Sequence, residues 1–275
     1  MNSRKPFFLF GLLAFGYAFL YIPILSLIVY SFNESRLVTV WGGFSTKWYG
    51  ELLRNDQILS AAWVSLRVAA MNASFAVLLG TLAALTLVRF GRFRGRLLFT
   101  TLVSAPLVMP EVILGLASLL LFVAMEQAIG WPAGRGITTI TLAHITFSAA
   151  FVTVVVQSRL GQMDTSLEEA AMDLGARPWK VFLVITLPVI APALVAGWLL
   201  AFTLSLDDLI IASFVAGPGS TTLPMVVYSS VRLGVSPQIN ALATLIVAFV
   251  TLCILIAGWL MHHREKQLRQ PRSGH

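Results

Sequence analysis

Cysteine and charge are both scarce in this chain, and each scarcity excludes a class of protein. Cys253 is the only cysteine among the 275 residues, so neither a disulfide within the chain nor a cysteine-paired metal site can form. Charged residues make up 11% of the sequence, whereas a typical soluble domain contains about 25%. With 57% hydrophobic residues and a mean hydropathy of +0.84, the composition is typical of an integral membrane protein.

The sequence patterns of enzymes are absent as well. No Gly-x4-Gly-Lys-Ser/Thr loop is present to cradle the phosphates of ATP, so energy from ATP would have to come through another chain. No helix carries two histidines spaced for a metal, and no nucleophile has a base nearby. We therefore expect no catalytic residue, no metal site and no cofactor bound by this chain. The net charge of +7 does not indicate nucleic acid, because the basic residues flank apolar segments.

Six apolar segments are long enough to cross a membrane. A hydrocarbon core of about 30 Å takes roughly 20 helical residues, and runs of this length favour helices over barrel strands. We therefore predict an all-α, polytopic membrane protein with six transmembrane helices, near residues 7–32, 60–88, 97–126, 137–158, 189–212 and 239–262. The first segment is too long for a signal peptide and lacks a cleavage site, so it is expected to remain as a span.

The basic residues predict the orientation. With the N-terminus inside, thirteen of the nineteen Lys and Arg residues fall on the inner side, five fall outside and Arg67 lies within the second span. The positive-inside rule then places both termini in the cytoplasm. Arg67 either reaches the outer headgroups or takes part in a pathway. The outer loop over 33–57 is expected to hold an interfacial helix, with one face made of Trp48, Tyr49, Leu52 and Leu53.

A short polar interruption separates the fourth and fifth segments. Ser166, followed three residues later by Glu169, matches a capping box and predicts the start of a helix. Gly175 predicts its end, and Pro178 fits the first turn of a second helix. One face of the first helix carries four apolar residues: Leu167, Ala170, Ala171 and Leu174. Three acidic residues are expected on the solvent side or near the positive N-terminal end of the helix dipole: Glu168, Glu169 and Asp173.

This interruption resembles the EAA loop in the membrane-spanning subunits of type I ABC importers. The matching pattern is Glu169-Ala170-Ala171-x3-Gly175-x9-Ile185-x-Leu187-Pro188. In that family the loop is a cytoplasmic coupling helix that inserts into the ATP-hydrolysing subunit. The resemblance implies that ten residues couple to the ATPase: Glu168, Glu169, Ala170, Ala171, Asp173, Leu174, Gly175, Ile185, Leu187 and Pro188. An ordinary cytoplasmic helical hairpin between two spans is the alternative.

Ionisable residues within the predicted spans are few, and such residues mark candidate functional sites. Glu111 follows two prolines, four residues apart, that are expected to break the third span. Asp207 and Asp208 lie near the end of the fifth span, where one of the pair either faces a pathway or caps a helix break through Ser205. His144 fits a hydrogen bond between helices, with a proton relay or a metal ligand as the alternatives.

Several longer stretches resemble the permeases of polyamine importers. They are Val40-Trp41, Trp48 to Leu52, Ala105 to Glu111, Asp207 to Phe214, Thr222 to Met225 and Ser236 to Thr244. The resemblance implies a subunit that passes putrescine, spermidine or both from a periplasmic binding protein to the cytoplasm. A diamine dication needs carboxylates and aromatic faces in place of water. Six residues could supply them along a substrate pathway: Glu111, Asp207, Asp208, Phe202, Phe214 and Tyr228.

The family resemblance also implies an assembly in the bacterial inner membrane. The multi-pass chain would form a heterodimer with a homologous permease and bind two ATP-binding subunits and the periplasmic polyamine-binding protein. ATP and magnesium would be held by the ATPase. The implied domains are the first helix with its periplasmic loop (1–57), the permease domain (58–262) with the coupling loop at 164–188, and a cytoplasmic tail (263–275).

Three other functions compete with this one. A permease of the same architecture could import another small solute, because the coupling loop is shared among such permeases. An ion-coupled secondary transporter would show internal repeats with matching broken helices, and the two halves of this sequence show none. A structural membrane scaffold is disfavoured, because intramembrane carboxylates would lower its stability without serving a purpose.

Overall fold

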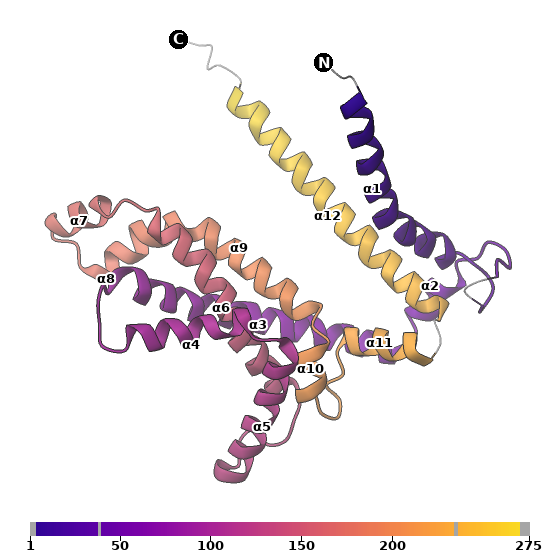
Figure 1. The fold of residues 1–275 in the computed structure, drawn as a ribbon, viewed down its shortest axis with the longest axis horizontal. Helices are drawn as coiled ribbons and strands as arrows, with labels where there is room; N and C mark the ends of the chain where they lie inside the picture. The colour runs from indigo at the N-terminus through magenta and orange to yellow at the C-terminus, as the bar shows by residue number, and fades with distance from the viewer. Residues whose placement is uncertain (1–3, 38–39, 234–235, 270–275) are drawn as a thin grey trace. The chain divides into compact units, whose positions relative to one another are not determined.

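The structure is a computed structural model and describes residues 4–37, 40–233 and 236–269 (Figure 1). Its regular elements are helical, and an isolated bridge between Asn33 and Phe44 is the only strand-like pairing in these ranges. The elements are α1 (Arg4–Ser31), α2 (Lys47–Leu52), α3 (Asp56–Arg89), α4 (Arg96–Val108), α5 (Glu111–Ile129), α6 (Ile137–Gly161), α7 (Ser166–Asp173), α8 (Pro178–Val181), the π-helical turn η1 (Phe182–Thr186), α9 (Leu187–Leu206), α10 (Ile210–Val215), α11 (Leu223–Leu233) and α12 (Pro237–Arg269).

The apolar helices have the lengths that a membrane requires. In the described part of the chain, five are long and apolar enough to cross one: Phe8–Ser31, Asp56–Arg89, Glu111–Ile129, Ile137–Gly161 and Pro178–Leu206. Two shorter apolar helices cover Arg96–Val108 and Pro237–Leu252. The predicted all-α polytopic class is confirmed. Of the predicted cytoplasmic tail, the part up to Arg269 continues α12, and residues 270–275 lie outside the described residues.

The third and fifth predicted spans are not continuous helices. The break expected in the third span lies between α4 and α5, which run in different directions in Figure 1. Met109 is extended there, as a residue before proline tends to be. The fifth span is interrupted at residues 207–209, and it begins earlier than predicted, because α8, η1 and α9 follow one another from Pro178 to Leu206.

The chain divides into two compact units. The first comprises Met1–Asp56 and Val227–His275, and the second Gln57–Val226. In the first unit, α12 packs against α1 and α2. The α2 face that was predicted to lie at the headgroups is instead partly buried in protein, with Trp48 and Leu52 each 3% exposed. The Trp48 indole N–H donates to the carbonyl oxygen of Asn33 at 2.6 Å, so the protein provides the partner expected from a lipid headgroup.

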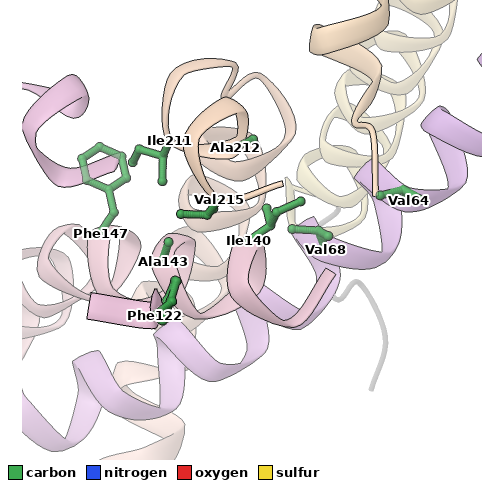
Figure 2. Close-up of a cluster of buried hydrophobic side chains, with 9 residues drawn as sticks. All are labelled: Val64, Val68, Phe122, Ile140, Ala143, Phe147, Ile211, Ala212 and Val215. Carbon is green, nitrogen blue, oxygen red and sulfur yellow. The ribbon is translucent and has the colours of Figure 1, made fainter. Parts of the chain in front are cut away.

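The second unit is built around α6, which packs against α4, α5, α9 and α10. Figure 2 shows one buried cluster of this unit, formed by Val64, Val68, Phe122, Ile140, Ala143, Phe147, Ile211, Ala212 and Val215. These residues come from α3, α5, α6 and α10. Asn72 adds a polar link, because its Nδ2 donates to Ser148 Oγ at 3.1 Å and to the carbonyl oxygen of Ala201 at 2.8 Å. One α3 side chain thus connects α6 and α9.

Close approach of α3 and α6 depends on a glycine. A Cβ added at Gly80 would lie 2.8 Å from Val152 Cβ and 3.0 Å from the carbonyl oxygen of Ala149. Across α6, a Cβ at Gly197 of α9 would lie 3.3 Å from Cγ1 of the same valine. Small residues of this kind let helices approach in lipid, where no hydrophobic effect drives them together.

We expect Gly80→Val to lower the thermal unfolding temperature of the detergent-purified chain. The added side chain would overpack the α3–α6 contact, and such changes cost about 1–3 kcal/mol. Gly16→Val is the matched control, because a Cβ at Gly16 meets nothing within 4 Å. Equal shifts for the two variants in a thermal unfolding experiment would contradict this account of the packing.

Candidate functional site

The predicted coupling loop is a helix-turn-helix whose first cap differs from the prediction. α7 begins at Ser166, so this residue is inside the first turn and the expected capping box with Glu169 is wrong. Asp164 supplies the cap instead, because its Oδ1 accepts the Ser166 N–H at 3.0 Å. The same hydrogen bond holds the pKa of the Asp164 carboxyl below its usual value.

The end of α7 follows the prediction. Gly175 has a φ of +84°, and its N–H donates to the carbonyl oxygen of Met172 at 2.8 Å. The Ala176 N–H donates to the carbonyl oxygen of Ala171 at 3.0 Å, which completes a Schellman motif. Pro178 occupies the first turn of α8, as predicted. The loop therefore has a fixed shape that local backbone chemistry sets.

Glu168 lies in the first turn of α7, near the N-terminal end of the helix as one of the two alternatives predicted, and it is not on the solvent side. Its side chain is 14% exposed, and its Oε1 lies 2.9 Å from Nη2 of Arg89, the last residue of α3. The Thr186 hydroxyl, at the end of η1, donates to the same oxygen at 2.5 Å. The partners lie 79 and 18 residues away in sequence, so no local pattern could identify them. Glu168 therefore links the loop to α3 through Arg89 and to the start of α9 through Thr186.

The rest of the loop exposes several large apolar side chains among charged ones. Leu174 is 90% exposed, and Leu167, Met172 and Trp179 are exposed as well. Glu169, Ala170, Asp173, Gly175 and Pro188 are also exposed, and Ala171, Ile185 and Leu187 are half-buried. Apolar side chains that gather on a loop between spans indicate a surface for another protein.

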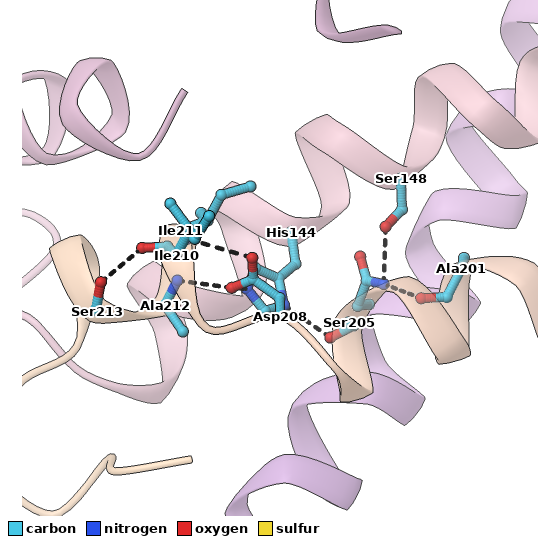
Figure 3. Close-up of polar contacts among 10 residues, drawn as sticks. His144, Ser148, Ala201, Ser205, Asp208, Ile210, Ile211, Ala212 and Ser213 are labelled. Atoms are coloured by element: carbon cyan, nitrogen blue, oxygen red, sulfur yellow. Dashed lines mark hydrogen bonds and ion pairs between the residues drawn. The ribbon is translucent and has the colours of Figure 1, made fainter. Parts of the chain in front are cut away.

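Asp208 organises the break between α9 and α10. Its Oδ1 accepts the Ile211 N–H at 3.2 Å and its Oδ2 accepts the Ala212 N–H at 2.8 Å, so the carboxylate caps α10 (Figure 3). The same Oδ2 lies 3.0 Å from His144 Nε2, and His144 Nδ1 lies 2.7 Å from Ser205 Oγ. The side chains of His144 and Asp208 are only 2% and 6% exposed.

These contacts show how His144 and Asp208 are bonded within the fold. His144 forms the predicted hydrogen bonds between helices, to Ser205 and to Asp208. Asp208 caps the helix break itself, whereas Ser205 bonds His144 instead of providing the cap. Because its carboxylate is engaged and buried, Asp208 has little surface to offer a passing cation.

Glu111 and Asp207 are placed differently from Asp208. Both are exposed: Glu111 in the first turn of α5 and Asp207 directly after α9. α5 packs against α10, with the ring of Phe214 against Gly115. This packing brings the Glu111 carboxylate within electrostatic reach of both aspartates. The two helix breaks therefore bring Glu111 near two adjacent aspartates that lie far from it in sequence.

The three aromatic candidates have different neighbours. Phe214 is half-buried and packs against the cluster of buried residues that Figure 2 shows. Phe202 stacks on Trp198 with ring centroids 5.2 Å apart. Tyr228 belongs to the first unit, where the Arg232 guanidinium lies 5.6 Å from the centroid of its ring. Among them, Phe214 packs against Gly115 of α5, the helix that begins with Glu111.

Arg67 is exposed, and it forms no ion pair with another described residue. It lies 22 residues before Arg89 on α3, which corresponds to about 33 Å along a helix. This length matches a hydrocarbon core of about 30 Å. The two arginines therefore fit opposite headgroup layers, as expected if Arg67 reaches the outer surface.

Comparison with known proteins places the chain in a family. The family model described as "Binding-protein-dependent transport system inner membrane component" matches residues 76–270. The chain is 64% identical over 256 residues to the putrescine transport system permease protein PotI of Escherichia coli K12, covering 93% of this chain and 91% of PotI. It is 43% identical over 251 residues to the spermidine/putrescine transport system permease protein PotC of the same strain, covering 91% and 92%.

A solved structure supports the fold. The bacterial ABC transporter that imports the acidic polysaccharide alginate contains a chain that superposes with a TM-score of 0.71. The superposition covers 95% of this chain and 98% of that chain, at 16% identity. Identity this low shows the fold alone, and the relatives of higher identity are transport components, not enzymes. The chain belongs to the family of binding-protein-dependent transport system inner membrane components, the multi-pass permease subunits of type I ABC importers.

Proposed function

We propose that this chain is a permease subunit of an ATP-driven polyamine importer that carries putrescine, spermidine or both from a periplasmic binding protein to the cytoplasm. The observation that carries the proposal is the 64% identity to PotI over 93% of the chain. The fold does not determine which solute is carried, because a chain with the same fold belongs to a transporter involved in the import of an acidic polysaccharide. The choice of a cationic solute is supported by the acidic group beside the two helix breaks.

Glu111 and Asp207 are the residues proposed to meet the substrate. Each carries an exposed carboxylate next to an interrupted span, where a water-filled cavity can form in a membrane protein. An ionised acid in hydrocarbon costs some 2.5–3.5 kcal/mol, so its retention there indicates a functional role. Asp208 is assigned a different part: it caps α10 and, with His144, fixes the break that presents Asp207.

The exposed apolar surface of α7 and α8 is proposed to dock on an ATP-binding subunit. The assembly would contain a homologous permease, two such subunits and the periplasmic binding protein, with ATP and magnesium held by the ATPase. A movement of α7 would reach α9 through Glu168 and Thr186, and α9 ends next to Asp207. This route connects ATP hydrolysis to the proposed substrate residues.

The proposed orientation places the coupling loop and both termini in the cytoplasm. The pair between Arg89 and Glu168 brings the arginine-rich loop at residues 89–96 to the same end of the second unit as the coupling loop. At the other end, the Thr139 hydroxyl donates to the carbonyl oxygen of Val215, and Gly217 lies against the backbone of Arg135. Basic residues concentrate at the first end, as the positive-inside rule requires of a cytoplasmic face.

Cysteine labelling tests this orientation. In a Cys253→Ala background, Arg54→Cys and Thr221→Cys should react with a membrane-impermeant thiol reagent added to intact cells, and Arg177→Cys should react only after the membrane is opened. All three native side chains are exposed, so access to the reagent is not limited by burial. Labelling of position 177 in intact cells would reverse the proposed topology.

The docking proposal predicts a specific loss of coupling. Leu174→Glu places a charge on the most exposed apolar side chain of the loop and should reduce ATP hydrolysis stimulated by the binding protein about tenfold or more, as expected for an interface hot spot. Phe90→Glu is the matched control, because Phe90 is 70% exposed in the neighbouring arginine-rich loop. The measurement is ATPase activity of the reconstituted complex. Equal stimulation in the Leu174 variant and the wild type would exclude the loop as the coupling element.

The pathway proposal predicts different effects for neighbouring acids. Glu111→Gln and Asp207→Asn remove charge while retaining size, and each should lower uptake of labelled putrescine roughly tenfold, equivalent to about 1.4 kcal/mol. Asp208→Asn should instead lower the thermal stability of the purified chain, because it weakens a buried contact with His144. Glu126→Gln is the control at the far end of α5 and should leave uptake unchanged.

Thermal unfolding of the same variants completes this experiment. Glu111→Gln and Asp207→Asn should unfold at the wild-type temperature, because both native side chains are exposed. Wild-type uptake in both single variants and in their double variant would show that passage of the substrate does not depend on these charges.

A further inference from the structure

An apolar groove lies on the second unit, away from the acidic group. Its walls come from α3, α4 and α6, and its volume is about 510 Å³. Leu79 and Leu82 of α3 and Leu102 of α4 are about half exposed or more along it. The groove is therefore open along one side of the helix bundle, and aliphatic side chains form its surface.

Among the residues that the structure describes, no charged group lines this groove. Three threonines do, but each hydroxyl donates to a carbonyl of its own helix: Thr86 to Leu82, Thr146 to Leu142 and Thr153 to Ala149. The hydrogen-bonding groups of the walls are thus engaged within the protein, and the remaining surface favours a hydrocarbon. The groove has nothing with which to replace the water of a polyamine and is separate from the proposed pathway.

The length of the groove along its helices matches the thickness of one leaflet of a bilayer. On α3 its walls begin three residues before Arg89 and extend to ten residues before it. On α4 they begin three residues after Arg96 and extend to ten residues after it. Both stretches cover about 5–15 Å from an arginine at 1.5 Å per residue. Half of a hydrocarbon core is about 15 Å thick, so the groove spans the leaflet whose headgroups adjoin the arginine-rich loop.

The arginine-rich loop, residues 89–96, provides unpaired positive charge at the mouth of the groove. Arg89 is engaged by Glu168, and Arg96 donates to the carbonyl oxygens of Gly91 and Leu87. Arg92 and Arg94 are exposed and form no ion pair within the described part of the chain.

The loop is also joined to the groove wall by an aromatic contact. The ring of Phe93 packs edge-on against that of Phe99, with centroids 6.3 Å apart, and Phe99 lines the groove. The two free guanidinium groups therefore belong to a loop that is held at the mouth of the groove.

We propose that this groove binds an anionic phospholipid, with an acyl chain between α3, α4 and α6 and the phosphate at Arg92 and Arg94. Basic residues directly beyond a transmembrane helix attract anionic headgroups by about 1 kcal/mol each, and the apolar walls accept the chain. The leaflet is the cytoplasmic one if the proposed orientation holds, but binding itself does not depend on which side that is.

A transmembrane helix is the other possible occupant of the groove, and the charge at the mouth argues against it. A helix provides no phosphate for the two free arginines, whereas one phospholipid supplies both an acyl chain for the apolar walls and a phosphate for the mouth.

Photolabelling of the complete importer tests the proposal. The purified complex is placed in phosphatidylcholine nanodiscs that contain a phosphatidylglycerol with a photoreactive acyl chain, and adducts are mapped by mass spectrometry. We expect adducts on peptides containing residues 79–86 and 99–106. Arg92→Gln combined with Arg94→Gln should reduce this labelling about tenfold or more, because two favourable charges are removed.

Two controls decide between a specific site and general lipid contact. Arg177→Gln removes an exposed charge from the coupling loop at the same end of the unit and should leave the labelling unchanged. A photoreactive phosphatidylcholine with the same chain should label these peptides weakly in every variant. Equal labelling by both lipids, labelling that is insensitive to the double arginine variant, or crosslinks from the groove to a protein helix would each overturn the proposal.

Discussion

Backbone N–H and C=O groups in hydrocarbon must find their partners within the protein, and the architecture of this chain depends on that requirement. It explains why helices form the described transmembrane part. Side-chain hydroxyl groups need partners there as well, and threonine hydroxyls on α3 and α6 donate to carbonyls of the preceding turn. Where a span is interrupted at residues 207–209, a side chain has to replace the missing helical hydrogen bonds. Asp208 does so by accepting two N–H groups of α10. The break is thus a defined structure held by a buried carboxylate.

The two adjacent aspartates lie in the break at residues 207–209, and their environments differ. Asp208 is turned inward to His144, whose other ring nitrogen meets Ser205, so one polar group joins α6 to the end of α9 and to α10. Asp207 remains exposed, near Glu111 at the break before α5. A break that is fixed by one acid can present the other to a passing cation, and this division of roles underlies the proposed pathway.

Features with local causes could be predicted from the sequence, and features that depend on distant partners could not. Apolar length predicted the spans, Pro110 the break in the third one, and Gly175 and Pro178 the turn of the coupling loop, because each depends on the conformational preferences of a few neighbouring residues. Glu168 was expected on the solvent side or near the positive end of the helix dipole, and its contacts with Arg89 and Thr186 were not predicted. The pairing of His144 with Asp208 and the burial of Trp48 were missed for the same reason. Hydrophobic patterns show which face is apolar, but they do not show which polar side chains will meet.

We propose that this chain forms part of the route by which a polyamine crosses the membrane at the expense of ATP. Uptake of labelled putrescine or spermidine can be measured in proteoliposomes that contain this chain, its cognate second permease and the ATP-binding subunits, with the binding protein and ATP supplied on their respective sides. We expect accumulation of at least one polyamine that requires ATP and the binding protein and disappears when this chain is omitted. Equal accumulation without this chain, or a complete complex that transports neither polyamine but does transport another solute, would contradict it.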